Sequence, residues 1–352
     1  MSSRIYLDHA ATSPLRPEAR AAMEEGFALW ANPSSPHAEG RKAKQALEDA
    51  RARIKAACKW DGEVIFTSGA SESLWIALNR SKAQRCVASA VEHDAVFRAA
   101  PDAEIIPVHP WDHEECDGEV DLDKIPNLSS AVVAVQHTNS ETGTAPNGPL
   151  VKSPLVERTR EAGGVFLQDC SQSLGHIPDC DMAVISAHKF GGPIGVGALL
   201  VRDFGLLQPT GGHERGYRQG TENLPAVMGM AAALALCDVG KHWILSPEQQ
   251  FDFANDLFKI SDQLRIGPKA PHILALTHPT MSAQALLIRL DAMGIAVSAG
   301  SACSSGTLKK SRVLDAFGVS DEVAARTIRV SLGWNTTTAE LDRFLEAWRS
   351  LQ

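Results

Sequence analysis

The alternation of short apolar runs with longer helical stretches is the feature that most constrains the fold of this chain. The apolar runs lie at residues 64–67, 131–135, 165–167, 182–185 and 198–201, and we interpret them as strands. Strands separated by helices predict an α/β fold with a mostly parallel sheet and helices on both faces. Ligands of such sheets gather beyond the carboxyl ends of the strands, so the residues after each strand are the first candidates for a site.

The C-terminal third has a different pattern, in which helices and strands no longer alternate regularly. Residues 237–247 indicate a boundary. Beyond it, helices are expected at residues 249–260, 283–293 and 338–351, and strands at residues 295–297 and 327–332. This mixture is typical of a smaller α+β domain. We therefore predict a large domain over residues 14–245 and a small domain that combines residues 1–13 with residues 246–352.

The composition excludes several classes of protein. With 44% hydrophobic and 22% charged residues, the chain is typical of a soluble globular protein. Its formal net charge of −8 argues against binding to nucleic acid or to a membrane surface. The seven cysteines are odd in number and form no CxxC pair, which argues against a disulfide framework and a zinc site. The same cysteine pattern predicts no metal and suits a reducing compartment. Because we also find neither an apolar signal core nor an apolar run that could cross a bilayer, we expect a cytoplasmic protein.

Two of the segments that follow strands carry chemistry that is ambiguous by itself. Residues 67–73 (TSGASES) join a glycine turn to a helix start, whose free N–H groups suit a phosphate, although such starts more often only cap the helix. Asp169, which follows the run at residues 165–167, is either a helix cap or a charge partner, and the cap is the commoner case. Neither segment identifies a ligand alone.

The segment after residues 182–185 decides between these alternatives. Lys189 lies between Ser186, His188 and a run of glycines that leads back into an apolar strand. Glycines let the backbone pass close to a bulky group, and an apolar setting lowers the pKa of an amine and keeps it nucleophilic. A phosphate cradle, an aspartate and a nucleophilic lysine are together what pyridoxal 5'-phosphate (PLP) requires. The aspartate keeps the pyridine nitrogen protonated, and the lysine forms a Schiff base.

Further motifs follow one another along almost the whole chain. They lie at residues 6–12 (YLDHAAT), 32–41, 67–73, 92–93, 169–172, 186–189, 211–221, 298–304 and 328–333. In this order they resemble the cysteine desulfurases (NifS/IscS-like) of the class-V PLP-dependent aminotransferase family. The resemblance implies the fold type I architecture of PLP-dependent transferases, with a mostly parallel seven-stranded sheet in the large domain and a smaller α+β domain. It also implies a homodimer that acts on L-cysteine.

The resemblance implies a role for each matching residue. Around the ring, Lys189 forms the Schiff base and moves the Cα proton, His93 stacks, Asp169 pairs with the ring nitrogen, and Gln172 hydrogen-bonds the phenolic oxygen. The phosphate is implied to bind at Ala70, Ser71, Ser186 and His188, with Thr221 supplied by the other subunit. Arg329 is implied to hold the substrate carboxylate through a fork of two hydrogen bonds.

Cys303 is the residue that the resemblance makes the sulfur acceptor, and its own surroundings agree. It lies among small residues and glycines at positions 298–307, which predicts a mobile and exposed loop. A sulfur that travels from cofactor to acceptor needs such a loop. Lys309 and Lys310 would favour the thiolate. The other cysteines divide into those interpreted as small buried hydrophobes (Cys58, Cys86 and Cys237) and those left open (Cys170 and Cys180).

The chain departs from the family pattern at the substrate clamp. Where family members usually have paired asparagines, it has Asn139 and Ser140, and the family residue that contacts the ring oxygen and the substrate carboxylate aligns with Ser140. Serine is shorter, so the clamp is weaker or water-mediated unless Asn139 takes its place. The segments around residues 93–109 and 239–271 are shorter than in typical members, which leaves the protein that accepts the sulfur undetermined.

We therefore expect an enzyme, a PLP-dependent L-cysteine desulfurase that yields L-alanine and a persulfide on Cys303 for transfer to a protein acceptor. A selenocysteine lyase or another class-V aminotransferase would use the same cofactor and is an alternative. A weakly active sulfur carrier or regulatory partner on the same fold is another. Iron–sulfur cluster biogenesis, tRNA thiolation and molybdenum-cofactor sulfuration all stay open as destinations of the sulfur.

Overall fold

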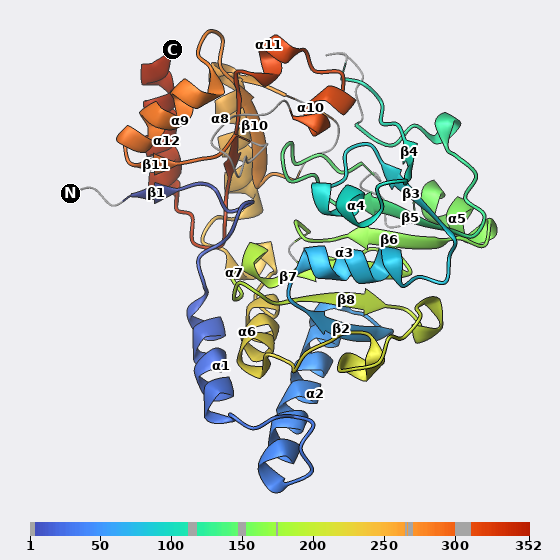
Figure 1. Ribbon diagram of the computed structural model, residues 1–352. Coiled ribbons are helices and arrows are strands. Elements are labelled where there is room, and N and C mark those ends of the chain that lie inside the picture. The colour runs from blue at the N-terminus through green and yellow to red at the C-terminus, as the bar shows by residue number, and fades with distance from the viewer. Residues whose placement is uncertain are drawn as a thin grey trace.

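The structure is a computed structural model that describes residues 4–111, 118–146, 153–173, 175–264, 266, 270–299 and 311–352 (Figure 1). Within these residues a seven-stranded sheet forms the centre of the larger part of the molecule. Its strands are, in spatial order, β2 (Glu63–Thr67), β8 (Gly197–Val201), β7 (Met182–Ser186), β6 (Val165–Asp169), β5 (Ala131–Gln136), β3 (Arg85–Ser89) and β4 (Glu104–Ile106). Neighbours from β7 to β4 are parallel, whereas β8 pairs antiparallel with both β7 and β2. The predicted mostly parallel α/β sheet is confirmed.

The burial of the strands explains which of them the sequence pattern predicts. Every residue of β5, β7 and β8 is buried, as expected for strands that helices cover on both faces, and their sequences are almost continuously apolar. The pattern did not predict β3 and β4. β3 begins with the half-buried Arg85 and Cys86, and β4 is a three-residue edge strand with Glu104 and Ile105 exposed. A short edge strand leaves little apolar signal in a sequence.

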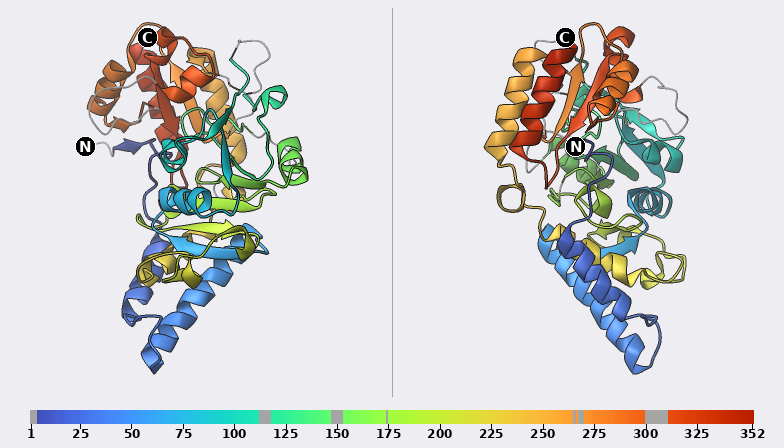
Figure 2. Two further views of the ribbon diagram at one scale, coloured as in Figure 1. Left: turned by 45° about the vertical axis from the view of Figure 1, so that its right-hand side comes forward. Right: turned by 90° about the vertical axis from the view of Figure 1, so that its left-hand side faces the viewer.

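Helices cover both faces of the sheet (Figure 2). One face packs against α1 (Pro17–Ala28), α2 (Ala38–Cys58), α5 (Pro154–Glu161) and α6 (Leu224–Leu234), and the other against α3 (Ala70–Asn79) and α4 (Asp94–Ala99). The apolar stripe of α2, which includes Leu47 and Ile54, is buried as its spacing predicts. Its start is fixed by His37, which accepts a hydrogen bond from the Gly40 N–H at 3.2 Å. α1 and α2 extend beyond the sheet as an antiparallel pair.

The smaller part combines the N-terminus with the C-terminal third. β1 (Ile5–Tyr6) pairs in parallel with β11 (Ile295–Ala296), and β12 (Thr327–Ser331), β10 (Ile273–Thr277) and β9 (Asp262–Gln263) form an antiparallel sheet. The helices in this third are α7 (Val239–His242), α8 (Pro247–Ile260), α9 (Ala283–Ala292), α10 (Arg312–Ala316), α11 (Asp321–Ala324) and α12 (Thr338–Leu351). The predicted α+β character is confirmed, and the exact boundaries at residues 13–14 and 245–246 stay a prediction.

The core of this smaller part is built on the amphipathic helix α12. Its Phe344 and Trp348 are fully buried and stack at 6.1 Å between ring centroids. Capping boxes at Ser246 with Gln249 and at Thr337 with Glu340 fix the starts of α8 and α12. Replacing Trp348 by alanine would cost about 3–5 kcal/mol, as for other buried aromatic residues.

The N-terminal segment after β1 runs between the two parts and joins them. His9 N–H and Ala10 N–H bond to Ser331 at the end of β12, and Ser13 N–H donates to the His188 carbonyl at 2.8 Å. The ring of His9 also packs where a Cβ on Gly333 would have to lie, at 1.9 Å from Nδ1, so only glycine fits at that position. The carboxyl ends of β6 and β7 therefore meet β12 across this segment.

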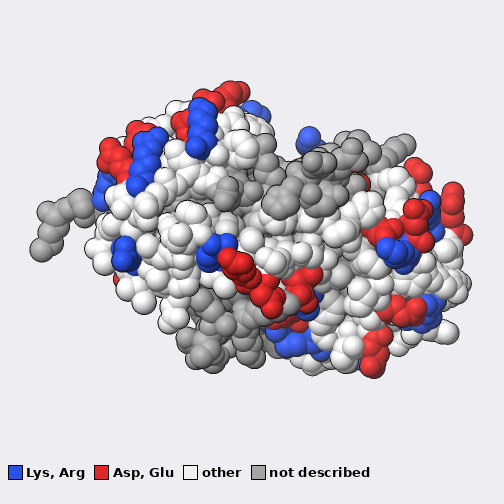
Figure 3. Space-filling view, turned by 90° about the horizontal axis from the view of Figure 1, so that it is seen from above, with Lys and Arg blue, Asp and Glu red and all other residues white. Residues whose placement is uncertain are grey.

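On the face of the molecule seen from above, charged side chains lie in small groups of both signs (Figure 3). Seen from above, blue and red groups alternate around the rim, and the part of this face that is not grey has no broad field of one sign (Figure 3). In the described part of the chain, no helix combines the length and the apolar character needed to cross a membrane.

Candidate active site

Lys189 lies at the carboxyl end of β7, in a single turn of 3-10 helix over Ala187–Lys189. Its Nζ donates hydrogen bonds to the carbonyls of Ala10 (2.7 Å) and Ala11 (3.0 Å) in the N-terminal segment. Burial, followed by the positive charge of Arg329, lowers the pKa of Lys189 to about 8, against the opposing effects of Asp169 and Asp8. The amine is therefore partly neutral near neutral pH, which a nucleophilic lysine requires.

The start of α3 forms a cradle of free N–H groups next to Lys189. Gly69 precedes the helix with φ +151°, a backbone conformation that side chains rarely adopt, and no side chain caps the helix. The first intrahelical bond is the one from Ser73 N–H to the Gly69 carbonyl at 3.1 Å. The N–H groups of Ala70 and Ser71 precede it and have no partner within the described residues, so they are available to an anion. The Ser186 Oγ lies 4.0 Å from the place of a Cβ on Gly69, so the end of β7 borders this cradle.

His188 stands on the same turn as Lys189. Its Nδ1 lies 3.2 Å from Thr12 Oγ1, and burial, followed by the charge of Lys189, lowers its pKa to about 4. His188 is therefore neutral at physiological pH. Toward a phosphate it would act as a hydrogen-bond donor rather than as a cation.

Asp169 and His93 border the same space from two neighbouring loops. Asp169 ends β6, and its Oδ1 accepts hydrogen bonds from Ser171 N–H (2.9 Å) and Ser171 Oγ (2.5 Å), which fix the carboxylate. His93 is the N-cap of α4 and accepts from Ala95 N–H at 3.1 Å, which fixes its ring. Desolvation lowers the pKa of His93, and the charge of Lys189 adds to this while Asp169 opposes it. These mutual effects place Lys189, His93 and Asp169 in one electrostatic neighbourhood.

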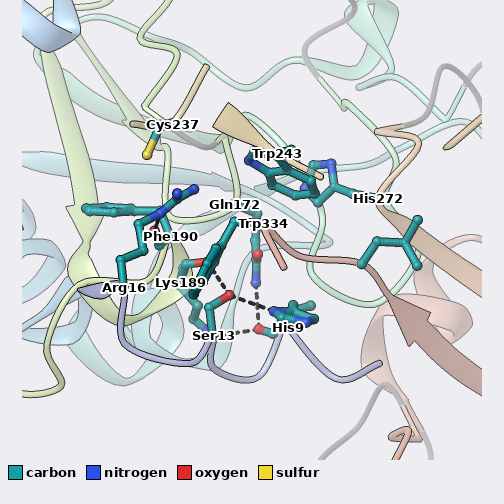
Figure 4. Close-up of a pocket in the computed structure, with 12 residues that line it drawn as sticks. His9, Ser13, Arg16, Gln172, Lys189, Phe190, Cys237, Trp243, His272 and Trp334 are labelled. Atoms are coloured by element: carbon teal, nitrogen blue, oxygen red, sulfur yellow. Dashed lines mark hydrogen bonds between the residues drawn. The ribbon is translucent and has the colours of Figure 1, made fainter. Parts of the chain in front are cut away.

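Gln172 is tied to the lysine through one shared carbonyl. Its Nε2 donates to the Ala10 carbonyl at 2.9 Å, and the same carbonyl accepts from Lys189 Nζ. In Figure 4 Gln172 lies between Lys189 on one side and Trp243 with His272 on the other. The N-terminal segment thus positions both residues, a contact that the sequence could not reveal.

Arg329 approaches from β12 on the opposite side. Its Nη2 bonds Asp8 Oδ1 and its Nη1 bonds the Ser140 carbonyl, both at 2.8 Å. Its Nε is buried without a hydrogen-bond partner in the part of the chain that the structure describes. An unpaired guanidinium N–H in a buried site is expensive, and a carboxylate would satisfy it.

Comparison with known proteins agrees with this arrangement. The aminotransferase class-V family matches residues 5–344. A cysteine desulfurase IscS from Dictyoglomus turgidum is 35% identical over 98% of this chain and 94% of its own length, and a cysteine desulfurase from Cereibacter sphaeroides is 34% identical over 97% and 94%. The chain belongs to the class-V aminotransferase family.

Solved structures share the fold over nearly the full length of the chain. A NifS-like protein from Rickettsia africae is 28% identical, with a TM-score of 0.83 over 99% of both chains. SspA, solved in complex with cysteine, is 25% identical, with a TM-score of 0.75 over 95% of this chain and 100% of its own. These similarities show that the class-V fold surrounds the site described here.

Asn139 and Ser140 are placed differently from each other. Asn139 is buried, and its Oδ1 accepts from the N–H groups of Glu141 (2.9 Å) and Thr142 (3.0 Å), while its Nδ2 donates to the Val91 carbonyl (3.2 Å). Asn139 would have to give up these bonds to reach a substrate. Ser140 is half-buried and contacts Arg329 through its backbone carbonyl, so the residue at the family position borders the clamp.

Cys303 lies in residues 300–310, outside the described residues, but both ends of that segment are attached to the site. Before it, Ser298 pairs with Arg329 through two backbone hydrogen bonds of 2.5 and 3.2 Å. After it, Ser311 donates its hydroxyl to Glu141 Oε2 at 2.6 Å, and Arg312 donates to the Ala90 and Glu92 carbonyls next to His93. The described residues on both sides of the segment that carries Cys303 therefore contact the site.

The five cysteines that the structure describes are free thiols of low reactivity. Burial raises the pKa of Cys58, Cys180 and Cys237 to about 12 and also raises the pKa of Cys86 and Cys170. None of these five is a thiolate at neutral pH. The open interpretation of Cys170 and Cys180 is thereby resolved toward structural roles. No group of metal ligands occurs among the residues described.

Thr221 is exposed, but the loop that carries it is held in place at Glu214. Glu214, in that loop, is buried and forms a bidentate ion pair with Arg51 (2.8 and 3.0 Å) and accepts from Phe66 N–H (2.8 Å). Glu214 and Arg215 both have positive φ, 47° and 57°. Holding two non-glycine residues in this conformation costs free energy, which the buried ion pair offsets. The pair fixes the loop against β2 and leaves Thr221 at the surface.

Several residues of the site had no role assigned from the sequence. Asp8 orients Arg329, Ala10 joins Gln172 to Lys189, and Glu92 holds the loop before His93. The Oε1 of Glu92 accepts from Ser89 Oγ (2.7 Å) and Gln136 N–H (2.8 Å), and its Oε2 is buried without a partner among the described residues. Burial raises the pKa of Glu92 to about 8. Only the motif at residues 6–12 and the pair at residues 92–93 could have pointed to them.

Proposed function

We propose that this protein is a PLP-dependent cysteine desulfurase. The observation that carries the proposal is the half-buried Lys189 amine of lowered pKa, set between an uncapped helix start and a fixed aspartate. The similarity to cysteine desulfurases over almost the whole chain supports the substrate class. In the wider setting, we also propose a homodimer that works in the cytoplasm and passes its sulfur to a protein acceptor.

The residues present fit PLP. The free N–H groups of Ala70 and Ser71, with Ser186 and His188, would hold the phosphate. Asp169 would pair with the ring nitrogen, His93 would stack, and Gln172 would bond the phenolic oxygen. Bound there, the cofactor would supply an electron sink for the substrate Cα. Thr221 of a second subunit would complete the phosphate site.

Arg329, Lys189 and Cys303 then have separate roles in the reaction. Arg329 binds the substrate carboxylate through Nε, oriented by Asp8 and the Ser140 carbonyl. Lys189 Nζ takes the proton from Cα and returns one when the alanine side chain forms. Cys303 attacks the substrate sulfur as a thiolate, so that the carbon–sulfur bond breaks and a sulfur–sulfur bond forms. L-cysteine and the Cys303 thiol thereby become L-alanine and a Cys303 persulfide, with atoms and electrons balanced.

The lysine is tested by absorption of the purified protein. We expect the wild type to be yellow, and Lys189→Ala to lose the visible band, while Lys82→Ala, at an exposed lysine, retains it. A Lys189→Ala protein that kept a borohydride-reducible cofactor would assign the covalent bond to another amine.

The thiol is tested by alanine and persulfide formation from L-cysteine. Cys303→Ser should form neither, whereas Cys86→Ser should resemble the wild type because Cys86 has a raised pKa and lies in β3. Competition between L-cysteine and selenocysteine distinguishes a selenocysteine lyase from a cysteine desulfurase. An aminotransferase does not need Cys303, so its turnover would persist in Cys303→Ser. Full turnover by Cys303→Ser without added thiol would contradict the persulfide mechanism.

A further inference from the structure

A large cleft, lined in part by Gln172, lies next to the site that surrounds Lys189. It has a volume of about 710 Å³, within the range of small-molecule pockets. Its walls are the C-terminal ends of α2 and α6, the loops after β5 and β6, the start of α8 and the segment before β10. It shares Gln172, Cys237 and His272 with the small cavity next to Lys189 (Figure 4). None of the roles proposed above uses it.

Gln250 presents an unsatisfied acceptor in the wall of this cleft. The residue is 1% exposed, and its Oε1 has no hydrogen-bond partner among the residues described. Its Nε2 donates to the Leu245 carbonyl at 3.4 Å, which fixes the orientation of the amide. A buried carbonyl oxygen without a donor costs about 1–3 kcal/mol, so a ligand that supplies an N–H or O–H would gain from it.

His272 presents a second acceptor. Its Nε2 is buried and unpaired within the described residues. Burial lowers its pKa to about 4, and a hydrogen bond with the Gln172 backbone opposes this. The neutral ring can carry its single proton on Nδ1, and a ligand that donates a hydrogen bond to Nε2 would favour this tautomer. Nε2 is then left with a lone pair.

Most of the remaining wall is apolar, although the exposed Arg53 and Asp238 also line the cleft. Small residues form much of the wall, among them Ala56, Ala57, Ala235 and Pro271. His137 contacts His176 edge to face at 5.4 Å between ring centroids, and burial, followed by the two other imidazoles, lowers the pKa of His137 to about 4. Neutral rings and small aliphatic groups favour a flat, uncharged ligand.

We propose that this cleft is a second binding site, for a small aromatic molecule that donates hydrogen bonds from a ring N–H or O–H to Gln250 Oε1 and His272 Nε2. The site is connected to the reaction centre. Gln172 lines the cleft, and its side chain shares the Ala10 carbonyl with Lys189. An occupant that moves Gln172 would therefore alter the surroundings of the lysine.

Indole and benzothiophene provide a matched pair of probes, because sulfur replaces the N–H in a ring system of nearly the same shape. We expect ligand-observed NMR on the holoenzyme to show that indole binds about fivefold more tightly, the effect of one net hydrogen bond. Gln250→Leu, which removes the acceptor, should reduce this preference. Ala235→Phe, which fills the cleft from an exposed position, should weaken both probes at least tenfold, whereas Ala28→Phe, exposed at the end of α1, should not.

Three results would overturn the proposal. The first is an absence of indole binding, which would mean that water alone satisfies the two acceptors. The second is equal affinity for the two probes. The third is binding that Ala235→Phe leaves unchanged, which would place the probes elsewhere. None of these binding measurements depends on desulfurase turnover, so a failure of this proposal is distinguishable from a failure of the proposed reaction.

Discussion

The two halves of the proposed active site are built in different ways. The cofactor half, which holds Lys189, Asp169 and the start of α3, comes from residues at or just after the carboxyl ends of β7, β6 and β2. The substrate half joins Arg329 on β12 to Asp8 near the N-terminus and to Ser140 after β5. The first half is therefore fixed by the order of elements in a parallel sheet, and the second by contacts between distant segments.

This difference predicts separate consequences for mutations in the two halves. A change in the substrate half should alter the handling of cysteine and leave the cofactor in place. A change in the cofactor half should alter both. The first prediction below tests the independence of the halves, the second tests a buried carboxyl group next to the cofactor half, the third tests the charge that links the halves, and the fourth tests the departure at Ser140.

The largest expected effect is that of Arg329→Lys. A lysine keeps the charge but loses the planar fork, so it cannot satisfy Asp8, the Ser140 carbonyl and a substrate carboxylate together. We expect kcat/KM for L-cysteine to fall about 100-fold, or about 2.7 kcal/mol, with the visible absorption band unchanged. Arg289→Lys, at an exposed position on α9, serves as the control. Loss of the band in Arg329→Lys would show that the two halves are not separable.

The second effect concerns Glu92, next to the cofactor half. Its folded pKa of about 8 lies above the ordinary value of 4.5, so the folded state holds a proton that the unfolded state releases. The resulting stability is complete below about pH 4.5 and declines as the pH rises to about 8. Glu92→Gln has no such dependence. We expect the difference in Tm, variant minus wild type, to increase by several degrees from pH 5 to pH 8.

The control for this prediction is the same substitution at an exposed carboxylate, Glu24→Gln on α1. Its difference in Tm from the wild type should stay nearly constant over this range. A flat difference for Glu92→Gln would show that Glu92 is ionised in the folded protein despite its burial.

The sequence predicts the two halves to different extents. The apolar runs place Asp169 and Lys189 at strand ends, and the topology then brings them together without further information. By contrast, the pairing of Asp8 with Arg329 joins residues 321 positions apart, and no periodicity encodes it. The strands β3 and β4, one with polar residues and the other short, also escaped the apolar pattern.

Asn139 shows the same limit at the level of one residue. The sequence suggested that it could take the place of the missing clamp asparagine. The structure instead commits its amide to the turn at residues 139–142 and to the Val91 carbonyl. Whether a polar side chain has hydrogen-bonding atoms left for a substrate depends on backbone geometry. The geometry of this turn depends on the packing of β5 against the loop that precedes His93.

The third prediction tests whether the charge of Arg329, in the substrate half, acts on Lys189, in the cofactor half. Arg329 is the second cause, after burial, of the lowered pKa of Lys189. Arg329→Met should therefore raise that pKa above about 8 and shift the midpoint of Lys189 labelling to higher pH. Reductive trapping of the cofactor-free protein with pyridoxal, located by peptide mass spectrometry, measures the midpoint. Arg326→Met removes the same charge three positions away and should shift it less. An unchanged midpoint in Arg329→Met would mean that burial alone sets the reactivity of the lysine.

The smallest effect is expected from Ser140→Asn, which restores the residue that family members usually have. Arg329 contacts Ser140 through its backbone carbonyl, so the substitution should preserve that bond and extend the side chain toward the clamp. One added hydrogen bond to the substrate carboxylate contributes about 0.5–1.5 kcal/mol, so KM for L-cysteine should fall about two- to tenfold with kcat nearly unchanged. Ser140→Ala separates the explanations: if it raises KM, the serine hydroxyl already binds substrate. If Ser140→Asn instead lowers kcat, the shorter side chain is an adaptation of this chain, because the longer one would then obstruct the approach of the sulfur-accepting thiol.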